Sequence, residues 1–154
     1  MFRTTLAAAA ALAGLAASAQ AQVTATQTVL SETVTVDERG RETVTTAPAD
    51  RVTPGDRLAY VLAYENEGSA PAEGVVLTMP VPKSVALIEA DREAGAPDYS
   101  VDGGESWGDL AGLAVTEDGE RRPARPADVT HLRWRLAAIA PGAAGEVRYR
   151  AVLR

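Results

Sequence analysis

The stretch that decides the fold is LAYVLAY, residues 58–64. Leucine and tyrosine side chains occupy every second position of this stretch, and alanine and valine occupy the positions between them. Side chains of a β-strand point alternately to opposite faces, so the pattern predicts a strand with one large apolar face and one small apolar face. Such a strand is typical of the centre of a sheet with both faces covered.

The same two-residue period recurs on both sides of this strand. Residues 29–36 and 42–46 are rich in valine and threonine and flank the turn sequence DERG, which predicts an N-terminal hairpin. Residues 132–136 and 147–153 alternate apolar with charged side chains, as in a sheet with one solvated face. Shorter strands are expected around residues 75–79, 85–88, 99–101 and 113–115.

Turn residues separate these strands, and no segment after residue 21 has a sustained helical period. Residues 108–128 read as mostly loop. We therefore predict an all-β fold, an immunoglobulin-like β-sandwich of two antiparallel sheets with about seven to nine strands. The expected core consists of Leu58, Tyr60, Leu62, Val75, Leu77, Trp134, Leu136, Val147 and Tyr149.

The first 21 residues have the three parts of a secretory signal peptide. Arg3 precedes an apolar run over residues 6–17, and the sequence ASAQA at 17–21 offers two small-x-small cleavage sites. A membrane-anchoring helix is the alternative, but the run is shorter than the roughly 20 residues that a span needs. We expect residues 1–21 to be removed, residues 22–154 to form a single domain, and the product to be periplasmic or extracellular without stable membrane insertion.

Composition narrows the possible chemistry of the 154-residue chain. There is no cysteine, which excludes disulfides, thiol catalysis and cysteine-ligated zinc, and a single histidine excludes a histidine-based zinc site. The formal net charge is -6. Phosphate backbones and anionic membranes repel an acidic domain, so we expect no nucleic-acid partner.

Residues 52–81 resemble a bacterial repeat family called domain of unknown function 11. The resemblance is carried by VTPGD at 52–56, LAY at 58–60, YENEG at 64–68, and the spacing of Ala72, Val75 and Leu77, and it extends to Trp134-x-Leu136 and Pro141-Gly142. The family implies an immunoglobulin-like sandwich in surface and secreted proteins, here in a single copy, and it implies no enzymatic activity. From their turn chemistry, Asp56, Asn66 and Gly68 are expected to be folding residues.

The sequence SVDGGESW at 100–107 is similar to the Asp-box of sialidase-type propellers. In that motif the aspartate, here Asp102, caps a turn and the tryptophan, here Trp107, packs beneath it, so we expect a stable hairpin. Two functional alternatives stay open. Trp107 could form a carbohydrate platform, and Asp98, Asp102 and Glu105 could bind calcium, although calcium takes about six to eight oxygen ligands.

Two further features are interpreted as surface features. Alternation places His131 on the exposed face of its strand with Arg133 and Arg135, without the nucleophile and orienting acid that a catalytic histidine needs. Residues 121–125 form a small basic cluster that follows acidic residues 117–120, which favours a solvated loop with local ion pairs. We predict no catalytic, cofactor-binding or metal-binding residue.

Three hypotheses for function follow. The first is a non-enzymatic module of the cell envelope that is structural or contacts another envelope or secreted protein, for example by adding a strand at a sheet edge. The second is a carbohydrate-binding module that uses exposed aromatic side chains such as Trp107. The third and weakest is a small hydrolase. No cofactor is expected, and the sequence leaves the oligomeric state open.

Overall fold

The computed structural model of the chain describes residues 20–154, so most of the predicted signal peptide lies outside the described residues. The first sheet has the strand order β2-β1-β3-β10-β5, with β1 (Val23–Val36), β2 (Glu42–Pro48), β3 (Arg57–Asn66), β5 (Val85–Ala90) and β10 (Ala144–Leu153). The second has the order β4-β9-β6, with β4 (Ala72–Pro80), β6 (Asp98–Ser100) and β9 (His131–Ile139). All neighbouring strands are antiparallel.

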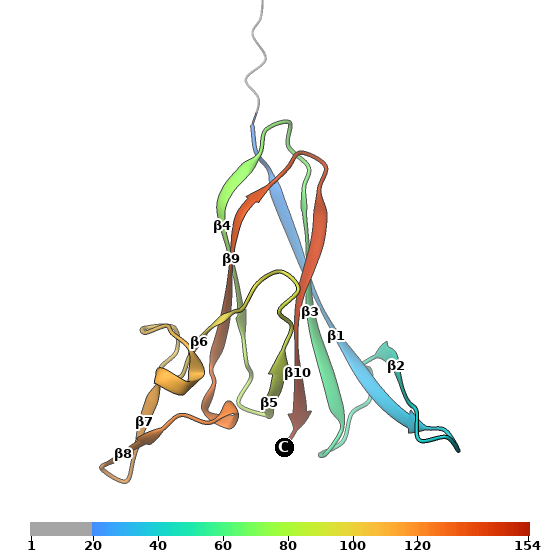
Figure 1. Cartoon of the computed structure of the whole chain (residues 1–154), viewed down its shortest axis with the longest axis vertical. Coiled ribbons are helices and arrows are strands. Elements are labelled where there is room, and N and C mark those ends of the chain that lie inside the picture. Colours follow the sequence, from blue (N-terminus) through green and yellow to red (C-terminus); the bar gives the residue numbers. More distant parts are fainter. Residues whose placement is uncertain (1–19) are drawn as a thin grey trace, which may run out of the picture.

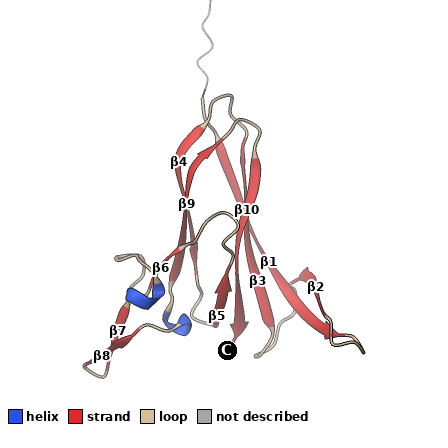
Figure 2. Cartoon of the chain, in the orientation of Figure 1, coloured by secondary structure: helices blue, strands red, loops and turns tan. Residues whose placement is uncertain are grey.

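The predicted all-β sandwich of antiparallel sheets is confirmed (Figure 1 and Figure 2). The strand count differs, because ten strands form within residues 20–154 rather than seven to nine. The region predicted as mostly loop folds into a separate two-stranded ribbon, β7 (Ala114–Glu117) and β8 (Glu120–Pro123). The ribbon turns at Asp118 and Gly119, whose φ angles of 53° and 84° suit a tight hairpin turn. Two short 3-10 turns, Leu110–Gly112 and Pro126–Asp128, flank it.

The core lies between the two main sheets. Among the predicted core residues, Leu62, Val75 and Leu136 are partly buried at its margin, and the other six are buried. The core also contains Met79, Val81, Val85, Leu87, Val129, Leu132 and Ala151, which were not among the predicted core residues. Met79, Leu132 and Ala151 continue the alternation that predicted their strands, whereas Val85 and Leu87 lie in the six-residue β5 and Val81 and Val129 lie outside the strands.

One interpretation of β3 is wrong. The second sheet covers only its large apolar face, and the small face lies on the outside of the sandwich, where Ala63 is exposed. Ala59 is nevertheless only 2% exposed. Arg150 is its register partner on β10 and reaches across β3 to Glu32 of β1, with Nε and Oε1 3.0 Å apart. Ala59 therefore lies under an arginine side chain and not under a third layer, whereas Ala63 stays open.

Aromatic side chains join the two sheets. Tyr60 and Tyr149 are cross-strand partners whose rings stack 4.6 Å apart at an interplanar angle of 7°. The Tyr149 hydroxyl donates to the carbonyl of Pro80 in the other sheet at 2.7 Å. In the reverse direction, Trp134 Nε1 donates to the carbonyl of Asp91, just after β5, at 3.2 Å. Tyr149 and Trp134 thus each fill the core and satisfy a polar atom across it.

The β1–β2 hairpin extends away from the sandwich (Figure 1). β1 pairs with β3 only as far as Glu32, whereas it pairs with β2 from Leu30 to Val36. Every residue of β2 is exposed. Among the described residues, no helix has the length and hydropathy that crossing a membrane would require.

Candidate functional site

The Asp-box-like loop is held by its own side chains, as predicted. The Asp102 carboxylate accepts hydrogen bonds from the amides of Glu105 and Ser106 at 3.1 and 3.0 Å, and from the hydroxyls of Ser106 and Ser100. These donors, the Ser106 hydroxyl foremost, hold the pKa of Asp102 well below its usual range. The backbones of Tyr99 and Gly108 close the loop with a reciprocal pair of hydrogen bonds.

Trp107 lies on the outer side of β9 and is half-buried. Its Nε1 donates to the carbonyl of Gly104 at 2.8 Å. The guanidinium of Arg133 sits 4.2 Å from the ring centre, and the His131 ring meets it edge-on at 6.4 Å. One ring face and the indole nitrogen are therefore engaged within the chain.

The three acidic residues considered as calcium ligands differ in their surroundings. Asp98 pairs with Arg133 and with Arg135, each at 2.9 Å. The Asp102 oxygens face loop donors, and Glu105 is exposed. Over residues 20–154, no three or more His, Cys, Asp or Glu side chains gather as a metal site would require.

His131 is half-buried rather than exposed, because Trp107 folds back against its strand. Its Nδ1 lies 3.1 Å from the hydroxyl of the adjacent Thr130. That hydroxyl also accepts from the Gly103 amide at 3.0 Å and donates to the carbonyl of Ser100 at 3.2 Å. The histidine therefore contributes to anchoring the loop.

The basic cluster does form local ion pairs. Arg122 contacts Glu117 at 2.6 Å, and it donates hydrogen bonds to both carboxylate oxygens of Asp128 at 2.7 and 2.9 Å. The Arg122 guanidinium is the main reason that the pKa of Asp128 falls to about 2. Glu117 belongs to the acidic run before the cluster, so its ion pair with Arg122 was predicted. Asp128 lies after the cluster, and its contact with Arg122 links β8 to the next 3-10 turn.

The turn residues of the family-like segment are folding residues, as predicted. Asp56 accepts from the Thr53 amide at 2.7 Å. Asn66 is fully buried, and its side-chain amide donates to the carbonyls of Ala70 and Ile139 and accepts from two backbone amides. A Cβ at Gly68 would clash with the carbonyl oxygen of Gln20, so the N-terminal segment requires glycine there.

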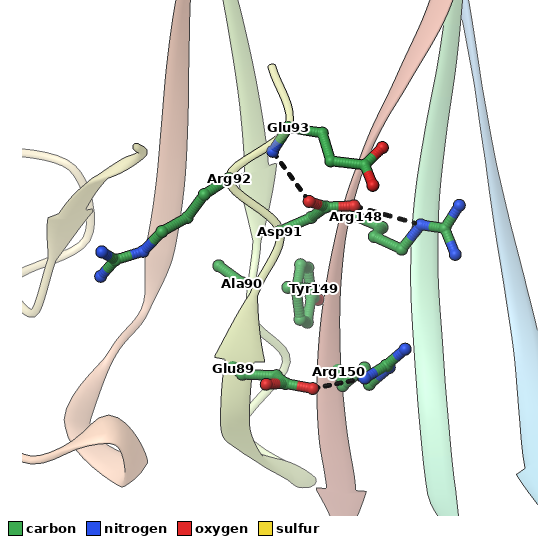
Figure 3. Close-up of a pocket in the computed structure, with 8 residues that line it drawn as sticks. All are labelled: Glu89, Ala90, Asp91, Arg92, Glu93, Arg148, Tyr149 and Arg150. Carbon is green, nitrogen blue, oxygen red and sulfur yellow. Dashed lines mark hydrogen bonds and ion pairs between the residues drawn. The ribbon is translucent and has the colours of Figure 1, made fainter. Parts of the chain in front are cut away.

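A cavity of about 360 Å³ lies beside β5 and β10 (Figure 3). Its walls carry charges of both signs, and two opposite pairs of them are in contact. Arg150 pairs with Glu89, and Arg148 approaches Asp91 with Nε and Oδ2 3.6 Å apart, while Arg92 points away from the group. Glu93 also lines the cavity, and its carboxylate forms no ion pair within the described residues, so the charges of the walls are only partly matched.

The free edge of β2 is different, because within residues 20–154 no strand pairs with the backbone groups on that side. The ladder with β1 is anchored by the Asp37 amide, which donates to the Arg41 carbonyl at 3.0 Å, and by the Ala49 amide, which donates to the Val29 carbonyl at 3.3 Å. In an antiparallel pair, only every second residue pair exchanges hydrogen bonds.

These two pairs fix which backbone amides and carbonyls of β2 bond to β1 and which do not. Positions 43, 45 and 47 bond to β1. The backbone groups of Glu42, Val44 and Thr46 point to the open side, where only Pro48, the last residue, lacks an amide proton. The side chains of these residues share one face with Val34 and Val36 of β1.

The other edges of the two main sheets carry features that discourage the addition of another strand. β5 pairs with β10 through a register shift at Arg150 and Ala151, β6 has three residues, and β4 contains Gly74 at φ 61° and ends at Pro80. β2 has seven residues, an unbroken register and no lysine. Val36 is 62% exposed and Val44 is 45% exposed. The signal in the sequence was the valine- and threonine-rich run itself, but its edge position was not readable there.

Comparisons with protein-family models, curated proteins and solved structures found no match to this chain. The resemblance of residues 52–81 to the bacterial repeat family therefore stays a prediction, and any function must be argued from the geometry.

Proposed function

We propose that this chain is an exported, non-enzymatic module that acts through protein–protein contact, and that a partner adds a strand at the free edge of β2. Export, a place in the cell envelope and membership of the repeat family belong to the same proposal. The observation that carries it is the combination of open backbone groups at Glu42, Val44 and Thr46 with side chains exposed on both faces of the strand.

Strand addition requires both open backbone groups and exposed side chains. Main-chain hydrogen bonds supply the affinity, and alternate side chains supply the selectivity. An edge left open in this way is a hazard for aggregation, so soluble proteins block it unless it is used. The Asp-box-like loop supports the proposal indirectly, since Trp107 is held by Gly104 and Arg133 and offers less to a sugar than an open ring would.

The test places a photo-crosslinking amino acid at Val44 of the full chain in the producing cells. We expect discrete crosslinked products that mass spectrometry identifies as protein. The matched control is the same substitution at Val76 on β4, which is 53% exposed and faces away from the core. No product from position 44, or the same products from position 76, would overturn the proposal.

A further inference from the structure

We infer that the free edge of β2 pairs with the β2 edge of a second copy of this chain, in antiparallel orientation about a two-fold axis at Val44. The inference rests on the proposed function and names its partner. The argument is that the edge is complementary to itself, which a strand used only for other partners need not be.

Hydrogen bonding is complementary in this register. Val44 faces Val44 of the second copy, and Glu42 faces Thr46 of that copy, as an antiparallel two-fold requires. These are the positions whose backbone groups point outward. Each free amide then meets a free carbonyl, for about six hydrogen bonds in all. Pro48, which has no amide to donate, falls outside the ladder.

The side chains on the valine face are also complementary. Val34 lies directly beside Val44 in the β1–β2 ladder. Pairing about Val44 extends this into a row of four valines across both hairpins, centred on the axis. Val44, 45% exposed in the single chain, is thereby covered by its own counterpart.

Threonines align on the opposite face. Thr35 lies beside Thr43 and Thr33 lies beside Thr45 in the hairpin. In the two-fold register, Thr43 faces Thr45 of the second copy, so two rows of four threonines form. Cross-strand threonine pairs are favourable.

Charge does not oppose the register. Glu42 is the one charged residue in β2, and it faces a threonine and not its own counterpart. Like charges placed directly opposite one another would destabilise the pair. The chain as a whole has a formal net charge of -6, so two copies repel at a distance and the association should strengthen when salt screens that repulsion.

A contact confined to one hairpin on each side is smaller than a standard interface of about 1,600 Å². We therefore expect a weak dimer that dissociates on dilution. Sedimentation of the purified, processed protein over a concentration series should show a monomer–dimer equilibrium. Val44→Pro removes two of the ladder hydrogen bonds and should raise the dimer Kd by about 30-fold or more, at roughly 1 kcal/mol for each bond. Val76→Pro, the same change at an exposed valine whose amide faces the outer edge of β4, should leave the Kd unchanged.

Disulfide trapping tests the register independently of these variants. The chain has no cysteine, so Val44→Cys introduces the only thiol. Facing residues in a hydrogen-bonded antiparallel pair have Cα atoms about 5.5 Å apart, within disulfide range. Mild oxidation should give a covalent dimer with Val44→Cys and not with Val76→Cys.

Two results would overturn the inference: a wild-type protein that stays monomeric at millimolar concentration, or a dimer that survives Val44→Pro. If the protein is monomeric while photo-crosslinking at position 44 captures a different protein, self-pairing is wrong and the proposed function stands. If neither a second copy nor another protein is captured at that position, both are wrong.

Discussion

Asn66 joins three separate segments through one buried side chain. Its carboxamide donates to the carbonyl of Ala70 in the following turn and to the carbonyl of Ile139 at the end of β9, and it accepts from the amides of Gln22 and Gly68. Asparagine supplies two donors and an acceptor in one flat group, and no apolar residue of that size can replace it. The buried amide therefore holds the N-terminal segment and two loops in register at one end of the sandwich.

Replacing this residue tests its role. We expect Asn66→Ala to lower the free energy of unfolding by about 2–4 kcal/mol, because several buried backbone groups lose their partner. Asn66→Asp should also destabilise, since a carboxylate cannot donate to the Ala70 and Ile139 carbonyls. Urea denaturation measures both. Gln27→Ala, at an exposed position of β1, is the control. A change of less than about 0.5 kcal/mol in Asn66→Ala would contradict this role.

The β1–β2 hairpin is the element on which both proposals depend. Its strands pair in an unbroken register, but only one side of β2 is used. The alternation of bonded and non-bonded pairs separates residues that support the hairpin from residues that face outward. Neighbouring positions in the same strand should therefore respond differently to the same substitution.

Substitution by proline distinguishes the two kinds of position, because proline has no backbone amide proton to donate. Val44→Pro should leave the hairpin intact, since the Val44 amide faces the open edge, where proline is tolerated. Thr45→Pro should open the hairpin, since that amide bonds to β1. Amide hydrogen exchange followed by NMR should show that Thr35 and Thr43 stay protected in Val44→Pro and lose protection in Thr45→Pro. Equal loss in the two variants would mean that the assigned register is wrong.

The sandwich as a whole is held by aromatic contacts between its sheets. Tyr149 is fully buried, stacks on Tyr60 and reaches the Pro80 carbonyl. Burial, reinforced by the neighbouring Tyr60, raises the pKa of Tyr149 above its ordinary value of 10.0, and burial also raises the pKa of Tyr60. Both rings must therefore stay neutral for the sheets to remain packed.

This coupling predicts alkaline unfolding. Both pKa values are raised on folding, so the stabilisation is fully present below pH 10 and is lost as the pH rises towards the raised values. Urea denaturation between about pH 8 and pH 11 should show this decline. Tyr149→Phe should cost about 1 kcal/mol at neutral pH through the lost hydrogen bond, and it should make the decline shallower. Tyr99→Phe, outside the central stack, should not. An unchanged decline in Tyr149→Phe would contradict the assignment.

The sequence by itself determined the features that depend on neighbours along the chain. The two-residue period of residues 58–64 predicts a strand, and the Asp102 turn closes on residues within a few positions of itself, so both could be read without a structure. Only the tertiary structure decided which strands lie at an edge and what covers each face. Arg150 covers Ala59 by reaching Glu32, and Trp107 packs on Arg133. These contacts join residues far apart in the chain, and local periodicity carries no information about such partners. For the same reason, local periodicity could not identify β2 as an edge strand, because that depends on whether another strand pairs with it, and none does in the part of the chain that the structure describes.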